Sequence, residues 1–228
     1  MKETVEKIAH IKSWEDIKKI FKNKVEEIPG IGKQAKSGSF GKLWKLKGKN
    51  LTLKLTTDIF EMETARDLLG KDSKAFLKIH KIIETPTQQV GGKNLPPLQL
   101  RVQELCYPID ELKKTHPLSL EKSTLTDQIR GNFSEIRGNI KTATDADVFF
   151  DALKDIEDEE ESYTAAKLQE IGNDPVKRRE LAQFVVKLVN LLERVEADIS
   201  GVDVADDLDI HTGNIMQDKK GTWKLVDF

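Results

Sequence analysis

The sequence has almost no cysteine and no long apolar run, and these absences exclude several classes of protein. Cys106 is the single cysteine, so no disulfide can form within the chain, and we expect a reducing, cytoplasmic setting. No apolar stretch approaches the length of a membrane span. The first residues, Met1 to Lys7, lack the apolar core of a secretory signal peptide. We therefore expect a protein without membrane segments.

Charge is nearly balanced overall but uneven along the chain. The net charge is −2, yet residues 1–54 hold 14 Lys against 6 Asp and Glu, a balance of +8. Such a basic segment can attract nucleotide phosphates, nucleic acid or an acidic partner. A solvated helix face followed by exposed strand lysines explains the same pattern. Hydrophobic residues make up 38% of the 228 positions, which is enough to bury a core without disulfides.

Hydrophobic periodicity divides the chain into three parts. Residues 1–28 have a helical pattern, residues 29–106 are rich in strand patterns, and residues 107–228 are mainly helical. In the second part, strands are predicted over 42–47, 51–55, 76–79 and 98–102, and a helix over 58–69. The clearest helix of the third part covers 180–199, and a hairpin follows over 215–217 and 223–226. This order of elements predicts an α+β fold.

Three polar residues near the C-terminal end have a spacing with a chemical meaning. Four residues separate Asp209 from Asn214, and a hairpin then leads to Asp227. This pattern resembles the catalytic loop and metal-binding strand end of the protein-kinase-like superfamily. His211 stands where eukaryotic-type protein kinases have Lys. It is closer to small-molecule kinases of the aminoglycoside-phosphotransferase type and to related atypical kinases.

The resemblance implies a role for each of these residues. Asp209 would orient the attacking hydroxyl and accept its proton, while Asn214 and Asp227 would hold Mg²⁺ for ATP. A carboxylate and an amide carbonyl are the hard oxygen ligands that magnesium prefers. Ordinary turn chemistry also explains Asp and Asn in a loop. The hairpin that ends in Asp-Phe and the long amphipathic helix before it favour the catalytic interpretation.

The strand-rich part carries signals that resemble the same family in order and spacing. Gly38, Ser39, Phe40 and Gly41 resemble a glycine-rich loop, in which backbone amides approach phosphates without a Cβ in the way. Lys36 replaces the first glycine of the family pattern. The loop is therefore expected to contribute to nucleotide binding, with one glycine fewer than usual.

Lys54 lies where the third strand of the family places its phosphate-binding lysine. Glu63, on the helix that follows, is the expected ion-pair partner of Lys54, and Glu61 is the alternative. Glu104 and Cys106 belong to a stretch that resembles the hinge between kinase lobes. Their main-chain groups would hold the adenine.

Together these resemblances imply a kinase-like two-lobed fold, with an N-lobe at 29–106 and a shortened, mainly helical C-lobe at 107–228. The implied activity is ATP- and Mg²⁺-dependent transfer of the γ-phosphoryl group to a hydroxyl. A protein acceptor is favoured over a small molecule, although His211 argues for the latter. The sequence stops at Phe228, where the family continues with an activation loop and more helices. The substrate platform that the family has there is then either missing, supplied by residues 107–200, or supplied by a regulatory or completing partner.

Two alternatives remain open from the sequence. The first is a pseudokinase, a nucleotide-binding scaffold with this fold but without useful phosphoryl transfer. The second is a helix-hairpin-helix DNA-binding protein, because Ile28 to Ala35 resemble the phosphate-binding turn of that motif. That motif needs a second helix directly after the turn, and Ser37, Gly38 and Gly41 would break it. Nucleic-acid binding is therefore the weaker alternative.

Overall fold

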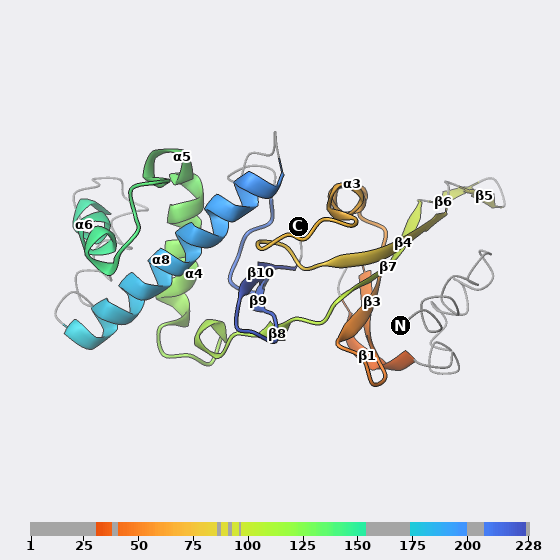
Figure 1. Cartoon of the computed structure of the whole chain (residues 1–228), viewed down its shortest axis with the longest axis horizontal. Helices are drawn as coiled ribbons and strands as arrows, with labels where there is room; N and C mark the ends of the chain where they lie inside the picture. Colours follow the sequence, from red (N-terminus) through yellow and green to blue (C-terminus); the bar gives the residue numbers. More distant parts are fainter. Residues whose placement is uncertain are drawn as a thin grey trace. The chain divides into compact units, whose positions relative to one another are not determined.

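Two units of different secondary structure make up the part of the chain that the computed structural model describes, residues 31–37, 41–85, 88–90, 93–95, 97–153, 174–199 and 208–226 (Figure 1). The sheet unit comprises Met1–Ser73 and Leu77–Leu105. The helical unit comprises Lys74–Phe76 and Cys106–Phe228. The predicted α+β class is thereby confirmed. The predicted helical segment 1–28 lies outside the described residues.

An antiparallel sheet in the order β1-β2-β3-β7-β4 forms the sheet unit. Its elements are β1 (Ile31–Ser37), β2 (Gly41–Leu46), β3 (Leu51–Thr56), α3 (Ile59–Leu68), β4 (Ile79–Thr85) and β7 (Leu98–Glu104). A separate hairpin pairs β5 (Gln88–Val90) with β6 (Lys93–Leu95). The strands predicted over 42–47 and 51–55 are confirmed as β2 and β3, and the predicted helix over 58–69 is confirmed as α3. The strand predicted over 76–79 is wrong in extent, because β4 begins at Ile79.

The two central strands, β3 and β7, are buried on both faces but with different chemistry. One face carries an apolar core, formed by Trp44, Leu46, Leu53, Leu55, Leu98, Leu100 and Val102. Since side chains alternate along a strand, the residues between these apolar ones point to the other face. Those residues are polar, and α3 lies on their side of the sheet (Figure 1).

Helices dominate the helical unit, whose elements are β8 (Tyr107–Pro108), the 3₁₀ turn η2 (Asp110–Leu112), α4 (Ser119–Gly131), α5 (Phe133–Ile136), α6 (Ala143–Leu153), α8 (Pro175–Asp198), β9 (Ile215–Gln217) and β10 (Trp223–Leu225). The Asp174 carboxylate caps α8 by accepting from two backbone N–H groups, and Pro175 occupies the first turn. The predicted helix over 180–199 is confirmed as the main part of α8, which buries an apolar stripe centred on Leu188.

A small sheet in the order β10-β9-β8 holds the predicted C-terminal hairpin, which is confirmed. Trp223 of β10 packs against Phe184 of α8, with ring centroids 6.0 Å apart. Lys224 Nζ is buried and donates to the main-chain oxygen of Phe76 at 3.1 Å. Phe76 also forms an isolated parallel bridge with Leu225. The hairpin is thus anchored to α8 on one side and to residues 74–76 on the other.

None of the helices in the described residues has both the length and the apolar character that crossing a bilayer requires.

Candidate functional site

The polar face of the sheet unit places three pairs of side chains opposite one another on β3 and β7. The strand register pairs Thr52 with Gln103, Lys54 with Arg101, and Thr56 with Gln99. Five of these six side chains are buried, and Lys54 is largely buried. Buried polar groups need hydrogen-bond partners, and α3 supplies several of them. The Gln99 amide, for example, donates to the main-chain oxygen of Met62 at 3.0 Å.

Helix α3 is fixed in rotation by its N-terminal cap. The Asp58 carboxylate accepts from the Glu61 backbone N–H at 3.1 Å, as an N-cap residue does for the third helical position. In a capping box the third-position Glu would reach back to the N-cap N–H. Here the Thr56 hydroxyl accepts from Asp58 N at 3.2 Å and donates to Glu61 Oε2 at 2.7 Å. The Thr56 hydroxyl thus leaves the Glu61 carboxylate free to turn toward the sheet.

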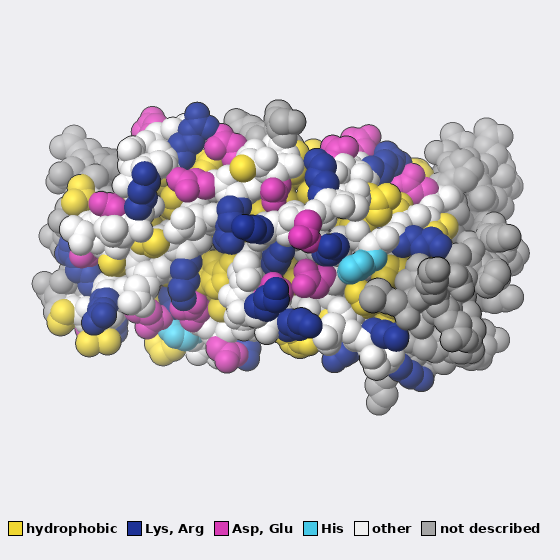
Figure 2. All heavy atoms as spheres, in the orientation of Figure 1, with side chains coloured by type: hydrophobic (Ala, Val, Ile, Leu, Met, Phe, Trp, Pro, Cys, Tyr) yellow, Lys and Arg dark blue, Asp and Glu magenta, His cyan; other side chains and the backbone are white. Residues whose placement is uncertain are grey.

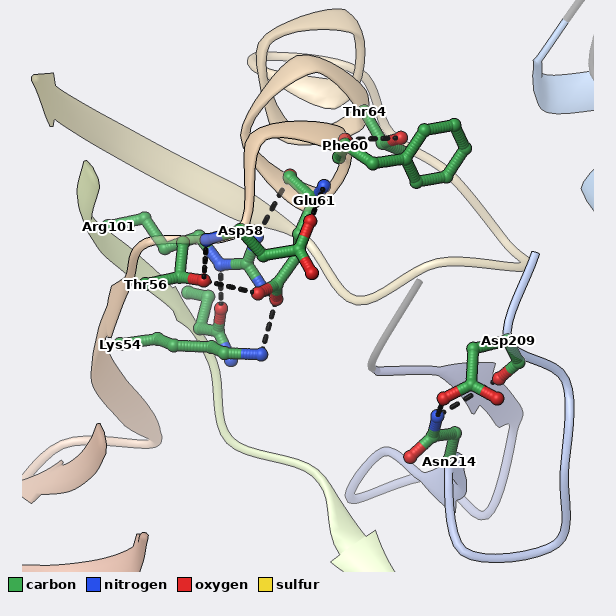
Figure 3. Close-up of polar contacts among 10 residues, drawn as sticks. Lys54, Thr56, Asp58, Phe60, Glu61, Thr64, Arg101, Asp209 and Asn214 are labelled. Carbon is green, nitrogen blue, oxygen red and sulfur yellow. Dashed lines mark hydrogen bonds and ion pairs between the residues drawn. The ribbon is translucent and has the colours of Figure 1, made fainter. Parts of the chain in front are cut away.

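Glu61, and not Glu63, is the ion-pair partner of Lys54 (Figure 3). The choice of Glu63 from the sequence is therefore wrong, and the alternative is correct. The physical reason is the helix register that Asp58 sets, because residues two apart on a helix point about 200° from each other. Glu61 is buried against the sheet, whereas Glu63 is exposed.

Arg101 was not expected at this site, and it is the second cation on the Glu61 carboxylate (Figure 3). Its Nη1 also donates to the Glu61 main-chain oxygen at 3.5 Å, and its Nε donates to Gln103 Oε1 at 2.5 Å. The signal for this cluster was the alternation of Leu and Val with Gln99, Arg101 and Gln103. In a strand buried on both faces, that alternation predicts a paired polar network.

In the helical unit, Asp209 and Asn214 lie together on one tight turn (Figure 3). Asn214 Nδ2 donates to the Asp209 main-chain oxygen at 2.9 Å and to Asp209 Oδ2 at 3.1 Å. Asn214 is buried, and the Asp209 side chain is 71% exposed. Among the described residues no donor reaches Asn214 Oδ1, so this hard oxygen remains suited to a magnesium ion.

His211 lies between these two residues and contacts one of them. Its Nδ1 accepts from the Gly213 backbone N–H at 3.0 Å, which leaves Nε2 to carry the ring proton. That Nε2 is 3.6 Å from Asp209 Oδ2. A Cβ on Gly213 would lie 2.7 Å from His211 Cε1, so glycine is required for this ring position. The loop therefore holds His211 beside the Asp209 carboxylate.

The β9–β10 hairpin returns the chain to the same turn. Val226 N donates to the Asn214 main-chain oxygen at 3.0 Å. The turn of this hairpin is closed by Asp218, whose Oδ1 accepts from Lys220 N at 2.7 Å and Thr222 N at 2.9 Å. Asp227, the predicted magnesium ligand, directly follows Val226 but lies outside the described residues.

The predicted glycine-rich loop is described only at its edges. Gly38, Ser39 and Phe40 lie outside the described residues, while Gly41 begins β2 and pairs with Thr56. Lys36 belongs to β1 and pairs with Leu43. Roles of the loop in phosphate binding remain predictions.

The predicted hinge residues lie at the boundary between the two units. Glu104 ends β7, and its backbone N–H already donates to Lys78 O at 2.8 Å. Its main-chain oxygen accepts from the Thr52 hydroxyl at 3.4 Å, a long contact that leaves room for a second donor. Cys106 is half-buried. An adenine contact at Glu104 would therefore fall to the main-chain oxygen.

The described residues contain no group of three or more His, Cys, Asp or Glu side chains placed to hold a metal ion. On the face drawn in Figure 2, acidic and basic side chains of the described residues are intermixed. Ile31 to Ala35 belong to strand β1, so the described residues after the predicted DNA-binding turn lack the helix that this motif needs. Compared with models of known protein families and with curated proteins, the sequence matches none.

Glu61→Gln should lower the free energy of unfolding by about 3–5 kcal/mol, because it takes the carboxylate from the buried Arg101 guanidinium. Glu63→Gln is the matched control, two residues away on the exposed side of α3, and should change it by less than about 0.5 kcal/mol. Urea unfolding measures both. Equal stability of the two variants would contradict the assignment of Glu61.

Asp218 should make the hairpin sensitive to acid. Its partial burial acts to raise the pKa, but hydrogen bonds from Thr222 and Lys220 backbone N–H groups outweigh it, so the pKa lies below its usual value. The charged form thus stabilises the fold above about pH 4, the unfolded-state pKa, and this contribution is lost as pH falls through the lowered folded-state pKa.

Asp218→Asn isolates this effect, because it keeps the acceptor oxygen and removes the charge. At pH 7 the variant should be less stable by about 1 kcal/mol, and the difference from the wild type should shrink below about pH 4. Urea unfolding from pH 3 to 7 measures the difference. A difference that grows on acidification would show the opposite sign and refute the assignment.

Proposed function

We propose that this protein is an ATP- and Mg²⁺-dependent phosphotransferase with a kinase-like two-lobed fold, in which the sheet unit is the N-lobe and the helical unit belongs to the C-lobe. One observation carries the proposal. Asn214 binds Asp209 by side chain and main chain, and the β9–β10 hairpin brings the residue before Asp227 back to Asn214. This local arrangement is what an Asp–Asn–Asp catalytic set requires.

The sheet unit adds an independent argument. Lys54 lies on the third strand of the sheet and forms an ion pair with a glutamate of the following helix. Kinases use a lysine and a glutamate from the same two elements to hold the nucleotide phosphates. Each unit therefore supplies residues that phosphoryl transfer needs. The sheet unit places them on a strand and a helix, and the helical unit places them on a turn.

The proposed reaction moves the γ-phosphoryl group of ATP to an acceptor hydroxyl. A bond forms between the acceptor oxygen and the γ-phosphorus, and the bond to the ADP oxygen breaks. Asp209 would take the hydroxyl proton, and Lys54 would donate to phosphate oxygens. Asn214 Oδ1 and the Asp227 carboxylate would hold the magnesium ion, which supplies charge neutralisation to the phosphates.

The acceptor that we favour is a hydroxyl on a protein. The Asp209 carboxylate is 71% exposed, so a hydroxyl carried by a large molecule can reach it. A regulatory partner remains part of the proposal. Nucleic acid is not favoured, because Ile31 to Ala35 form a strand.

Binding of ATP with magnesium should stabilise the protein. At one hundred times the dissociation constant the gain is about 2.7 kcal/mol, which corresponds to a rise in Tm of roughly 5–10 °C for a chain of this length. EDTA or Asp227→Asn should remove most of the rise, and the control Glu63→Gln should keep it. Unchanged melting of the wild type at saturating ATP and magnesium would refute the nucleotide site.

Asp209→Ala should separate binding from transfer. Loss of the general base should reduce phosphoryl transfer by about 10²–10⁴-fold, while the melting shift with ATP and magnesium stays as in the wild type. Lys54→Ala should weaken both. Transfer from radiolabelled ATP to a protein acceptor and to water measures the rate. Wild-type turnover in Asp209→Ala would contradict its role as the base, and ATP binding without any turnover of the wild type would favour the pseudokinase.

A further inference from the structure

Arg101 occupies an unusual position for a charged residue. It lies in the middle of β7, opposite Lys54 in the neighbouring strand, and its side chain is 0% exposed. Charged side chains are almost never fully buried unless they are paired, because leaving water costs more than most contacts return. The partners of the Arg101 guanidinium therefore indicate its role.

Three different N–H groups of Arg101 are used in three directions. Nη2 binds the Glu61 carboxylate, Nη1 donates to the Glu61 main-chain oxygen, and Nε donates to Gln103 Oε1. The planar guanidinium has fixed donor directions, which a lysine ammonium does not reproduce. Arg101 thus binds both the side chain and the main chain of Glu61, in the first turn of α3.

Lys54 and Arg101 share this carboxylate but differ in access to solvent. The Lys54 side chain is 12% exposed, whereas Arg101 has no exposed surface. A phosphate can therefore contact Lys54 but cannot contact Arg101 in this arrangement. Ligand contact belongs to Lys54, and the effect of Arg101 on a ligand must pass through Glu61.

We propose that Arg101 is a positioning residue that keeps Glu61 and the N-terminal turn of α3 on the sheet before any nucleotide is bound. The inference rests on the proposed function, since it assigns Lys54 to the phosphates. Moving α3 away would break the contacts of Glu61 with both Arg101 and Lys54, and Arg101 would lose its carboxylate partner. A form of the free protein with α3 moved off the sheet is therefore strongly disfavoured. Nucleotide binding then leaves the position of α3 unchanged. Lys54 is held ready in the free protein.

Hydrogen exchange of the α3 amides (Ile59–Leu68) tests the first half of this inference without any need for activity. In the wild type, their protection should be high and should change by less than about twofold when ATP and magnesium are added. In Arg101→Met the free protein should lose at least about tenfold in protection of the α3 amides from Glu61 onward, which have acceptors in Asp58 and in the helix itself. Protection of wild-type α3 that appears only with nucleotide would overturn the proposal.

The second half is tested by nucleotide kinetics. Arg101→Met should raise KM for ATP by about tenfold or more, with a smaller change in kcat, because Lys54 loses its fixed orientation for the phosphates. Arg101→Lys keeps the positive charge but not the fixed donor directions of the guanidinium. Its KM for ATP should therefore lie between those of the wild type and Arg101→Met. The matched control is Arg66→Met, which removes another arginine that links α3 to the sheet, through Glu84 of β4. It should leave KM within about twofold.

If Arg101→Met does not fold, the double variant Arg101→Met with Glu61→Met takes its place. Replacing both members of a buried ion pair by apolar side chains is tolerated better than removing one. This double variant should fold and should show a raised KM. Because it also removes the partner of Lys54, it reports on the Glu61–Arg101 pair as a unit, while Arg101→Lys reports on Arg101 alone. A wild-type KM in the folded double variant, or an equal effect of Arg66→Met, would overturn the proposal. If the wild type binds no ATP, the proposed function fails, and the hydrogen-exchange comparison still decides whether Arg101 fixes α3.

Discussion

The position of the Glu61 carboxylate is the constraint on which the polar face of the sheet unit depends. Lys54 and Arg101 approach it from neighbouring strands, and Thr56 donates to it from the end of β3. A shared buried carboxylate is tolerated only when its oxygens accept hydrogen bonds, and here each Glu61 oxygen accepts at least one. The same contacts fix the rotation of α3 and the direction of the Lys54 side chain. The cap of α3, the register of β3 with β7 and the direction of the Lys54 side chain thus all depend on the position of Glu61.

The helical unit positions its candidate residues by a different device. Asn214 binds the main chain of Asp209, Gly213 donates to the His211 ring, and Val226 returns to the Asn214 main chain. These are short-range contacts within a turn and a hairpin, so closing them costs little chain entropy. They need no buried charge, and the Asp209 carboxylate stays in water. Such an arrangement suits a group that must meet an incoming hydroxyl.

Elements with strong local signals were predictable from the sequence. Periodicity gave α3, α8 and both hairpins, because each buries a face with a regular repeat. Rotation of α3 was not settled by its apolar residues, yet the Asp58 and Glu61 spacing of an N-cap and a third helical position contained the answer. Arg101 was missed because alternation is usually taken to mean one solvated face, whereas tertiary packing buries both faces of β7. The functional assignments of all the candidate site residues stay predictions, and Gly38, Ser39, Phe40 and Asp227 also lie outside the described residues.

The buried charges of Glu61 and Arg101 are better explained by the need to fix the register of α3 on the sheet than by a gain in folding stability. Apolar side chains of the same volume would hold the helix about as firmly, because a buried ion pair repays little more than its own desolvation. Apolar contacts, however, tolerate a small slide or rotation of a helix, since many neighbouring packings have similar energy. A one-residue shift of α3 would turn Glu61 by about 100° and break its contacts with Lys54, Thr56 and Arg101 together. The ion pairs of Glu61 therefore fix the register of α3 on the sheet, which a purely apolar interface would not do.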